Sequence, residues 1–143
     1  MPDLAPDHRR GAGLDPAPFH QLPGDTRAPA QTFFVRAEDG IRLRLGLWRP
    51  DGAPSGTVLL FPGRTEYVEK YGRVVGRLRA LGLSVAVIDW RGQGMSDRLL
   101  PDPRAGHIRD FADYQTDVVE MVLAADALTL PRPWHLLAHS MGG

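Results

Sequence analysis

Hydrophobic residues follow two different spacings along the chain, and these spacings predict its strands and helices. Short runs rich in β-branched and aromatic residues predict strands at residues 32–36, 41–45, 57–61, 84–88 and 134–138. Apolar residues three or four positions apart predict helices at residues 66–81 and 110–128. Two strands are thus followed by alternating strands and helices.

The first two predicted strands form an antiparallel hairpin. Between them, the sequence Glu-Asp-Gly at residues 38–40 is a turn signal, because Gly40 can adopt a positive φ. Apolar and basic residues alternate in residues 41–45, so the isoleucine and leucines face a core while Arg42 and Arg44 point into water. The hairpin is therefore expected to be half buried.

Two of the other three predicted strands, residues 57–61 and 84–88, are apolar runs without alternation, a pattern typical of strands that are covered on both faces. The third, residues 134–138, is expected to be a short buried strand. A helix separates each of these strands from the next, and right-handed crossovers of this kind make the strands parallel. The predicted fold class is α/β: an antiparallel hairpin followed by a βαβαβ unit, in three layers with helices on both faces of the sheet.

Each predicted helix has one apolar face. In the first helix this face contains Tyr67, Tyr71, Val74, Val75, Leu78 and Leu81. In the second helix it contains Phe111, Tyr114, Val118, Val122 and Ala125. Gly82 is expected to end the first helix, and Asp110 is expected to cap the start of the second.

Composition separates a leader from the domain. Residues 1–30 contain six prolines and show no helical or strand periodicity, which predicts a flexible or irregularly docked leader before a domain at residues 31–143. Phe19 and Leu22 are candidates for docking part of this leader onto the domain. No apolar run approaches the ~20 residues of a membrane span, and the N-terminus lacks the apolar core of a signal peptide. We therefore expect no stable membrane insertion and a cytoplasmic location.

The balance of charges excludes some classes of partner. Acidic and basic residues are equal in number, at 17 each, so no nucleic-acid partner is expected. The chain has no cysteine, which excludes disulfides and thiolate zinc sites. None of the five histidines has a spacing that indicates metal ligation. We expect neither a metal nor a cofactor.

Three loops follow the C-terminal ends of the parallel strands, where chemistry sits in sheets of this kind. They are residues 62–65, residues 89–97 and the turn at Ser140. Ser140 is the candidate nucleophile, because it comes directly after a strand and lies between Ala138 and Gly142. Small residues at these two positions are what a sharp strand-to-helix turn around a nucleophile requires.

Two backbone amides are candidate donors of an oxyanion hole, which stabilises negative charge on a reacting carbonyl oxygen. One belongs to Met141, directly after the serine. The other belongs to Arg64, or alternatively to Thr65, where Gly63 lets the backbone approach a substrate. The Arg64 side chain itself is expected at the surface.

Two further features are interpreted as structural. The loop at residues 89–97 contains glycines but lacks the third glycine and the helix start of a dinucleotide-binding motif, so we interpret it as support for the serine loop. His139 adjoins Ser140 and therefore points away from it, so it is not expected to act as its base. His107 is expected to pack or cap the loop before the second helix.

Four segments carry a family resemblance: VLLFPGRTEYVEKYG, VIDWRGQGMSD, GHIRDFADYQTDV and LLAHSMGG. In this order, over residues 32–143, they resemble the N-terminal portion of α/β-hydrolases of the monoacylglycerol lipase and lysophospholipase type, also grouped with serine aminopeptidase-like hydrolases. Two positions depart from the family pattern. Ala138 replaces the first glycine of Gly-x-Ser-x-Gly, and Pro62 stands where a histidine often precedes the oxyanion glycine.

The resemblance implies a serine hydrolase that acts on small-molecule carboxylic esters, of the lysophospholipid or monoacylglycerol type, through an acyl-enzyme. It assigns Ser140 as the nucleophile and the amides of Arg64 and Met141 as oxyanion donors. The triad acid and histidine come after the serine in this family's chain order. Because the chain stops at Gly143, we expect it to hold only the nucleophile and oxyanion half and to be inactive alone.

The resemblance also implies a strand order: the hairpin, then residues 84–88, 57–61 and 134–138. The last strand would be an open edge through which the chain could self-associate. The alternative functions are a truncated non-catalytic remnant, a partner-binding fragment, or a peptidase or thioesterase of the same fold. Dehalogenase and epoxide hydrolase chemistry is disfavoured, because those relatives carry an aspartate at the position of Ser140.

Overall fold

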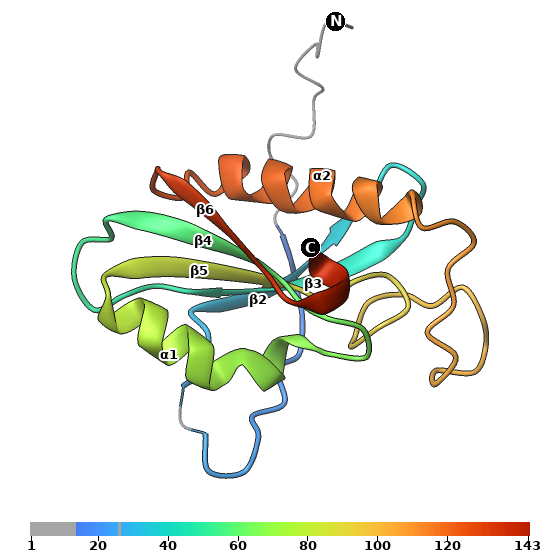
Figure 1. Cartoon of the computed structure of the whole chain (residues 1–143), viewed down its shortest axis with the longest axis horizontal. Coiled ribbons are helices and arrows are strands. Elements are labelled where there is room, and N and C mark those ends of the chain that lie inside the picture. The colour runs from blue at the N-terminus through green and yellow to red at the C-terminus, as the bar shows by residue number, and fades with distance from the viewer. Residues whose placement is uncertain (1–13, 26) are drawn as a thin grey trace, which may run out of the picture.

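The computed structural model describes residues 14–25 and 27–143, which form one six-stranded sheet with helices on both faces (Figure 1). The strands are β1 (Asp15–Pro16), β2 (Gln31–Arg36), β3 (Arg42–Trp48), β4 (Gly56–Phe61), β5 (Leu83–Ile88) and β6 (Trp134–Ala138). The helical elements are η1 (Val68–Tyr71), α1 (Gly72–Ala80), α2 (Asp113–Ala127) and η2 (Ser140–Gly142), of which η1 and η2 are 3-10 turns.

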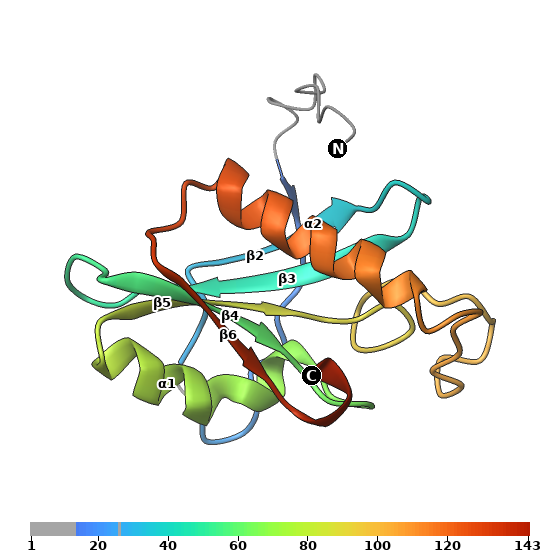
Figure 2. The same ribbon diagram turned by 45° about the horizontal axis from the view of Figure 1, so that its top comes forward.

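The sheet has the order β1-β2-β3-β5-β4-β6. β2 and β3 are antiparallel, while β4 runs parallel to both β5 and β6. The hairpin joins the parallel core through an antiparallel pairing of β3 with β5. The α/β fold class and the predicted strand order are therefore confirmed. β6 lies at the edge of the sheet next to β4 (Figure 2), and its residues after Trp134 are exposed, so the expectation that this strand is buried is wrong.

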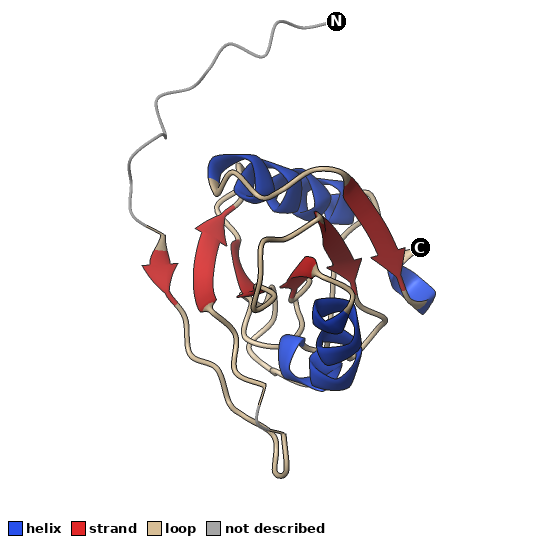
Figure 3. Ribbon diagram, turned by 90° about the vertical axis from the view of Figure 1, so that its left-hand side faces the viewer, coloured by secondary structure: helices blue, strands red, loops and turns tan. Residues whose placement is uncertain are grey.

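The helices α1 and α2 lie on opposite faces of the sheet (Figure 3). A hydrophobic core lies under each of them. β4 contributes to both, because successive side chains of a strand point to opposite faces. Val58 and Leu60 pack in the core that contains Val75 of α1. Leu59 and Phe61 pack in the core that contains the buried residues of α2. This two-sided burial explains why β4 and β5 have apolar sequences without alternation.

Part of the predicted leader packs on the sheet. β1 pairs with β2 in antiparallel orientation. The ring of Phe19 lies edge-on to that of Trp48, with 5.9 Å between the ring centroids, and Leu22 is half-buried. Residues 1–13 and residue 26, which also belong to the predicted leader, lie outside the described residues.

The expectation of a half-buried hairpin is wrong for its second strand. The side chain of Arg44 is fully buried, and so are all residues from Leu43 to Trp48. The reason is that η1 and the chain near Pro18 cover the face of β3 opposite the leucines. A Cβ atom on Gly46, on that face, would lie only 2.7 Å from Val68 of η1. In this strand the alternation of apolar and basic residues therefore includes an arginine, Arg44, that is buried and does not point into water.

The first predicted helix is divided into two parts. η1 comes first, and the α-helix begins only at Gly72. Tyr67, Val74 and Leu81, predicted to face the core, are exposed instead. A 3-10 turn has three residues per turn, so positions before Gly72 do not continue the helical period of α1. Gly82 ends the helix with a φ of +80°, as predicted.

The buried face of α2 also differs from the prediction. Phe111 and Val122 are exposed by 62% and 39%. The residues that are buried are Tyr114, Asp117, Met121, Ala124 and Ala125. Asp117 is fully buried because it pairs with Arg91 under the helix, and this buried polar residue shifts the inward face away from a purely apolar stripe. Oδ1 of Asp110 accepts a hydrogen bond from the backbone amide of Ala112 at 2.9 Å, but Ala112 precedes the first residue of α2.

Candidate active site

β6 leads directly into a tight turn with Ser140 at its apex. Ser140 has a φ of +54°, a left-handed backbone conformation that residues other than glycine rarely adopt. A Cβ atom on Gly142 would lie 2.2 Å from the carbonyl oxygen of Phe61, so only glycine fits at this position. Ala138, by contrast, is exposed. The turn thus has the strained geometry of a nucleophile elbow, and its close approach to β4 occurs at Gly142.

The three residues predicted to carry chemistry lie around one hollow of about 520 Å3. Ser140, Met141 and Arg64 line it together with Ala105, Gly106, His107, Ile108, Phe111 and Tyr114. Ser140 is exposed, so its hydroxyl is accessible. The hollow brings together the loop after β4, the turn after β6 and the segment before α2.

Two backbone amides beside this hollow are free of internal hydrogen bonds. Among the described residues, no group accepts a hydrogen bond from the amide of Arg64 or of Met141. The Thr65 amide, the alternative donor, is already bound to Oε1 of Gln93 at 3.0 Å. This contact leaves Arg64 as the residue of the loop whose amide can bind an oxyanion together with Met141.

Glu66 lies behind the same loop and was missed by the sequence analysis. Its Oε1 accepts a hydrogen bond from Lys70 Nζ at 2.8 Å. Its Oε2 accepts one from the Gly63 amide at 2.8 Å and another from the Tyr71 hydroxyl, and it lies 3.2 Å from Nδ1 of His139. Burial alone would raise the pKa of the Glu66 carboxyl, but these four contacts outweigh it and lower the pKa from 4.5 to about 2. Glu66 is therefore ionised at neutral pH.

The histidines near Ser140 are placed as packing or positioning groups. His139 faces Glu66, as expected for a residue adjacent to the serine. His107 lines the hollow itself, which the sequence analysis did not anticipate. Within residues 14–25 and 27–143, no histidine hydrogen-bonds to the Ser140 hydroxyl.

The loop after β5 is fixed by buried charges. Asp89 accepts hydrogen bonds from the Val68 amide at 2.8 Å, the Met95 amide at 2.9 Å and Arg44 Nε at 2.7 Å. Arg44 also forms two hydrogen bonds to the carboxylate of Glu69, at 2.6 and 2.7 Å. Burial opposes ionisation of Glu69, but the hydrogen bonds from Arg44 lower its pKa below the ordinary range. A fully paired buried cluster therefore joins β3, η1 and this loop.

The same loop supports the loop at residues 62–65, whereas we expected it to support the serine loop. The indole Nε1 of Trp90 donates to the carbonyl oxygen of Pro62 at 2.8 Å. Oε1 of Gln93 accepts a hydrogen bond from the Thr65 amide, and its Nε2 donates one to the carbonyl oxygen of Gly63 at 3.4 Å. Charged and amide side chains directly after a buried strand were the sequence signal that could have revealed this role.

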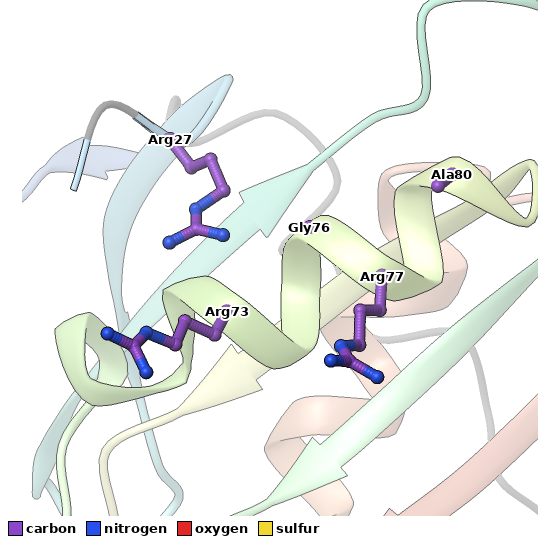
Figure 4. A pocket seen from close by; sticks show the side chains of 5 residues that line it. All are labelled: Arg27, Arg73, Gly76, Arg77 and Ala80. Carbon is purple, nitrogen blue, oxygen red and sulfur yellow. The ribbon is translucent and has the colours of Figure 1, made fainter.

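A second hollow, of about 480 Å3, lies beside α1 and away from Ser140. It is lined by Arg27, Arg73, Gly76, Arg77 and Ala80 (Figure 4). Among the described residues, no cluster of histidine, aspartate and glutamate side chains is arranged to hold a metal ion. In the same part of the chain, no helix has the length and apolar character needed to cross a bilayer.

Comparisons with known proteins match this geometry to one family. The family model described as "Serine aminopeptidase, S33" matches residues 52–143. Lysophospholipase L2 of Escherichia coli is 44% identical over 89 residues, covering 60% of this chain and 25% of that protein. Monoacylglycerol lipase of Mycolicibacterium smegmatis is 38% identical over 106 residues, covering 73% of this chain and 35% of that protein.

A solved structure shares the fold. The soluble variant of monoglyceride lipase from Saccharomyces cerevisiae has a TM-score of 0.60 and 22% sequence identity, covering 90% of this chain and 40% of that one. The chain thus spans between a quarter and two fifths of the length of these relatives. The family match includes both the loop at residues 62–65 and the Ser140 turn. The chain belongs to the serine aminopeptidase S33 family of α/β-hydrolases.

Proposed function

We propose that the protein hydrolyses carboxylic esters of the monoacylglycerol or lysophospholipid type, with Ser140 as its nucleophile. The observation that carries this proposal is the position of Ser140, on a strained and exposed turn that shares a hollow with Arg64 and Met141. The free amides of Arg64 and Met141 support their role as oxyanion donors. Relatives named as lysophospholipase and monoacylglycerol lipase support the class of substrate.

In the proposed reaction, Ser140 Oγ attacks the ester carbonyl carbon and loses its proton to a general base. The carbonyl oxygen becomes an oxyanion, which accepts hydrogen bonds from the Arg64 and Met141 amides. The bond from carbon to the ester oxygen then breaks, and the alcohol leaves with the proton. Water attacks the acyl-enzyme, which releases the carboxylic acid and restores the serine.

The general base is proposed to come from outside residues 1–143. In α/β-hydrolases the acid and the histidine follow the serine in chain order, and all five histidines of this chain precede Ser140. His139, the nearest in sequence, is engaged with Glu66. This chain would therefore contribute the nucleophile and the oxyanion donors, and a serine without its base is a weak nucleophile at neutral pH.

The lining of the hollow supports an acyl substrate. Ile108, Phe111, Tyr114 and Met141 present apolar surface beside the serine. An acyl chain that lies against these side chains would leave its carbonyl group at Ser140. The polar headgroup would then extend toward solvent.

The test uses the natural protein in its full length. It is treated with a fluorophosphonate probe and, separately, with a monoacylglycerol, a lysophosphatidylcholine, a thioester and an aminopeptidase substrate. We expect labelling and ester hydrolysis, both lost in Ser140→Ala. Ser55→Ala, at another exposed serine, is the matched control and should retain both.

Other outcomes would contradict the proposal. Ester hydrolysis that persists in Ser140→Ala would place the nucleophile elsewhere. Preference for the thioester or the peptide would favour the alternative chemistry of the same fold. A protein that is neither labelled nor active would support the non-catalytic, partner-binding alternative.

A further inference from the structure

Glu66 connects the two parts of the proposed oxyanion hole. Its side chain is only 9% exposed and lies between the loop after β4 and the turn after β6. Oε2 accepts a hydrogen bond from the amide of Gly63, the residue before Arg64. The same oxygen contacts Nδ1 of His139, the residue before Ser140. A single carboxylate oxygen thus touches the residues next to one oxyanion donor and next to the nucleophile.

Gly63, the Glu66 carboxylate and the His139 ring are closely packed against one another. A Cβ atom on Gly63 would lie 3.0 Å from Nδ1 of His139 and 3.1 Å from Oε2 of Glu66. The carbonyl oxygen of Gly63 is held on its other side by Gln93 and by the Glu66 amide, at 3.4 and 3.3 Å. Gly63 is therefore held through both its amide and its carbonyl oxygen, and that carbonyl belongs to the peptide unit that carries the Arg64 amide.

We propose that Glu66 is a positioning residue, whose Oε2 sets the distance between the Arg64 amide and the Ser140 turn. The inference rests on the proposed function, since it concerns the geometry of that site. Donors of an oxyanion hole act only when they are held close to the productive position, within roughly 0.5 Å. A carboxylate that binds both loops restricts their relative movement without touching the substrate.

The two oxygens of Glu66 have different partners, which allows a sharp test. Oε2 faces Gly63, Tyr71 and His139. Among the residues that the structure describes, Oε1 faces only Lys70, whose side chain is 54% exposed. A glutamine can keep an acceptor oxygen at the Oε2 position. A methionine of similar length keeps neither acceptor. Removing Lys70 disturbs only the Oε1 side.

Three variants are compared in the intact protein with p-nitrophenyl butyrate as the probe substrate. In Glu66→Met we expect kcat to fall on the order of tenfold or more, with KM within about twofold, because the lost contact matters most when the oxyanion forms. Glu66→Gln and Lys70→Met should keep kcat within about threefold of the wild type. An equal loss in Glu66→Gln and Glu66→Met would show that charge matters instead, and an unchanged kcat in Glu66→Met would overturn the proposal.

A second variant covers the case in which Glu66→Met does not fold. His139→Ala removes the other end of the contact, and the His139 side chain is 65% exposed, so folding should be preserved. We expect a several-fold lower kcat with little change in KM. If Glu66→Met folds, the double variant should lose less than the product of the two single losses. A wild-type kcat in His139→Ala would refute the connecting role of Glu66.

A readout without catalysis separates this inference from the proposed function. Amide hydrogen exchange of the peptide that covers residues 62–66 should be at least several-fold faster in Glu66→Met than in Glu66→Gln. Failure of the proposed function would appear as ester hydrolysis that survives in Ser140→Ala, whatever the exchange rates are. Equal exchange in both variants would refute the positioning role even if Ser140 proves to be the nucleophile.

Discussion

The loop after β5 and the turn after β6 lie at the same end of the sheet, on the two strands that flank β4, but different forces hold them. The loop after β5 is fixed by buried charges, in which Asp89 joins Arg44 to two backbone amides. The turn after β6 is fixed mainly by backbone contact, where Gly142 meets the carbonyl oxygen of Phe61.

The difference follows from what each segment does. The loop after β5 supports other segments, and buried charge pairs give it one well-defined geometry when every polar group is satisfied. In the proposed function the turn after β6 has to expose the Ser140 hydroxyl, which a covering polar network would prevent. A positive φ at Ser140 and a glycine two residues later supply the shape instead. We expect the two segments to fail in different ways when they are disturbed.

The largest effect is expected from Arg44→Met, which leaves Asp89 and Glu69 buried without their partner. Breaking a buried ion pair by removing one member costs about 3–5 kcal/mol of unfolding free energy. Denaturant unfolding of the intact protein measures this loss. Arg42→Met, on the same strand but 44% exposed, is the control and should cost less than about 1 kcal/mol. Similar losses in both variants would contradict the special role of buried charge.

Gly142→Ala is expected to have the next largest effect on stability and to abolish most activity. The added Cβ would lie 2.2 Å from a backbone oxygen, and overpacking of this kind costs about 1–3 kcal/mol. The turn would have to shift, and Ser140 and the Met141 amide would move with it. Gly52→Ala meets no atom within 4 Å and should change stability by no more than about 0.5 kcal/mol. Full ester hydrolysis by Gly142→Ala would show that the turn tolerates displacement.

A smaller effect should appear in the pH dependence of stability through Glu66, which connects the two sides of the site. Its pKa is about 2 in the folded protein, below the ordinary 4.5. The stabilisation is therefore complete above about pH 4.5 and is lost as the pH falls toward 2, because the unfolded chain takes up the proton first. Unfolding free energies measured from pH 5 to pH 3 should fall less steeply in Glu66→Gln than in the wild type. Parallel slopes would mean that the Glu66 pKa is not lowered by folding.

The smallest effect is expected from Arg64→Ala. The side chain of Arg64 is exposed, and the group proposed to bind the oxyanion is its backbone amide, which alanine retains. We expect kcat/KM for an ester to stay within about threefold of the wild type and stability to change by no more than about 0.5 kcal/mol. A loss of 100-fold or more would assign a direct role to the guanidinium group.

Much of this architecture could be predicted from local pattern. Runs such as residues 57–61 and 84–88 are apolar at every position after the first, which indicates a strand with a helix on each side. Gly82 was recognised as a helix end because a positive φ there favours glycine. Ser140 was recognised because the sequence around it contains both the strand and the small residues of the turn.

Long-range polar contacts could not be predicted in the same way. Arg44 lies 25 residues from Glu69 and 45 from Asp89 in the chain, and no local spacing indicates that they meet. Glu66 is separated from His139 by 73 residues. The inward face of α2 was predicted only in part: Tyr114 and Ala125 are buried as expected, but the burial of Asp117 depends on its pairing with Arg91.

By itself the sequence determined the α/β order of strands and helices, the candidate nucleophile and the family resemblance, because these depend on short-range periodicity and on contiguous motifs. Only the tertiary structure decided which charges are buried, which amides near Ser140 are free and which side chain contacts both the loop at residues 62–65 and the serine turn. The physical reason is that burial of a polar group is favourable only when a partner is present. That partner is supplied by the fold, from a distant part of the chain.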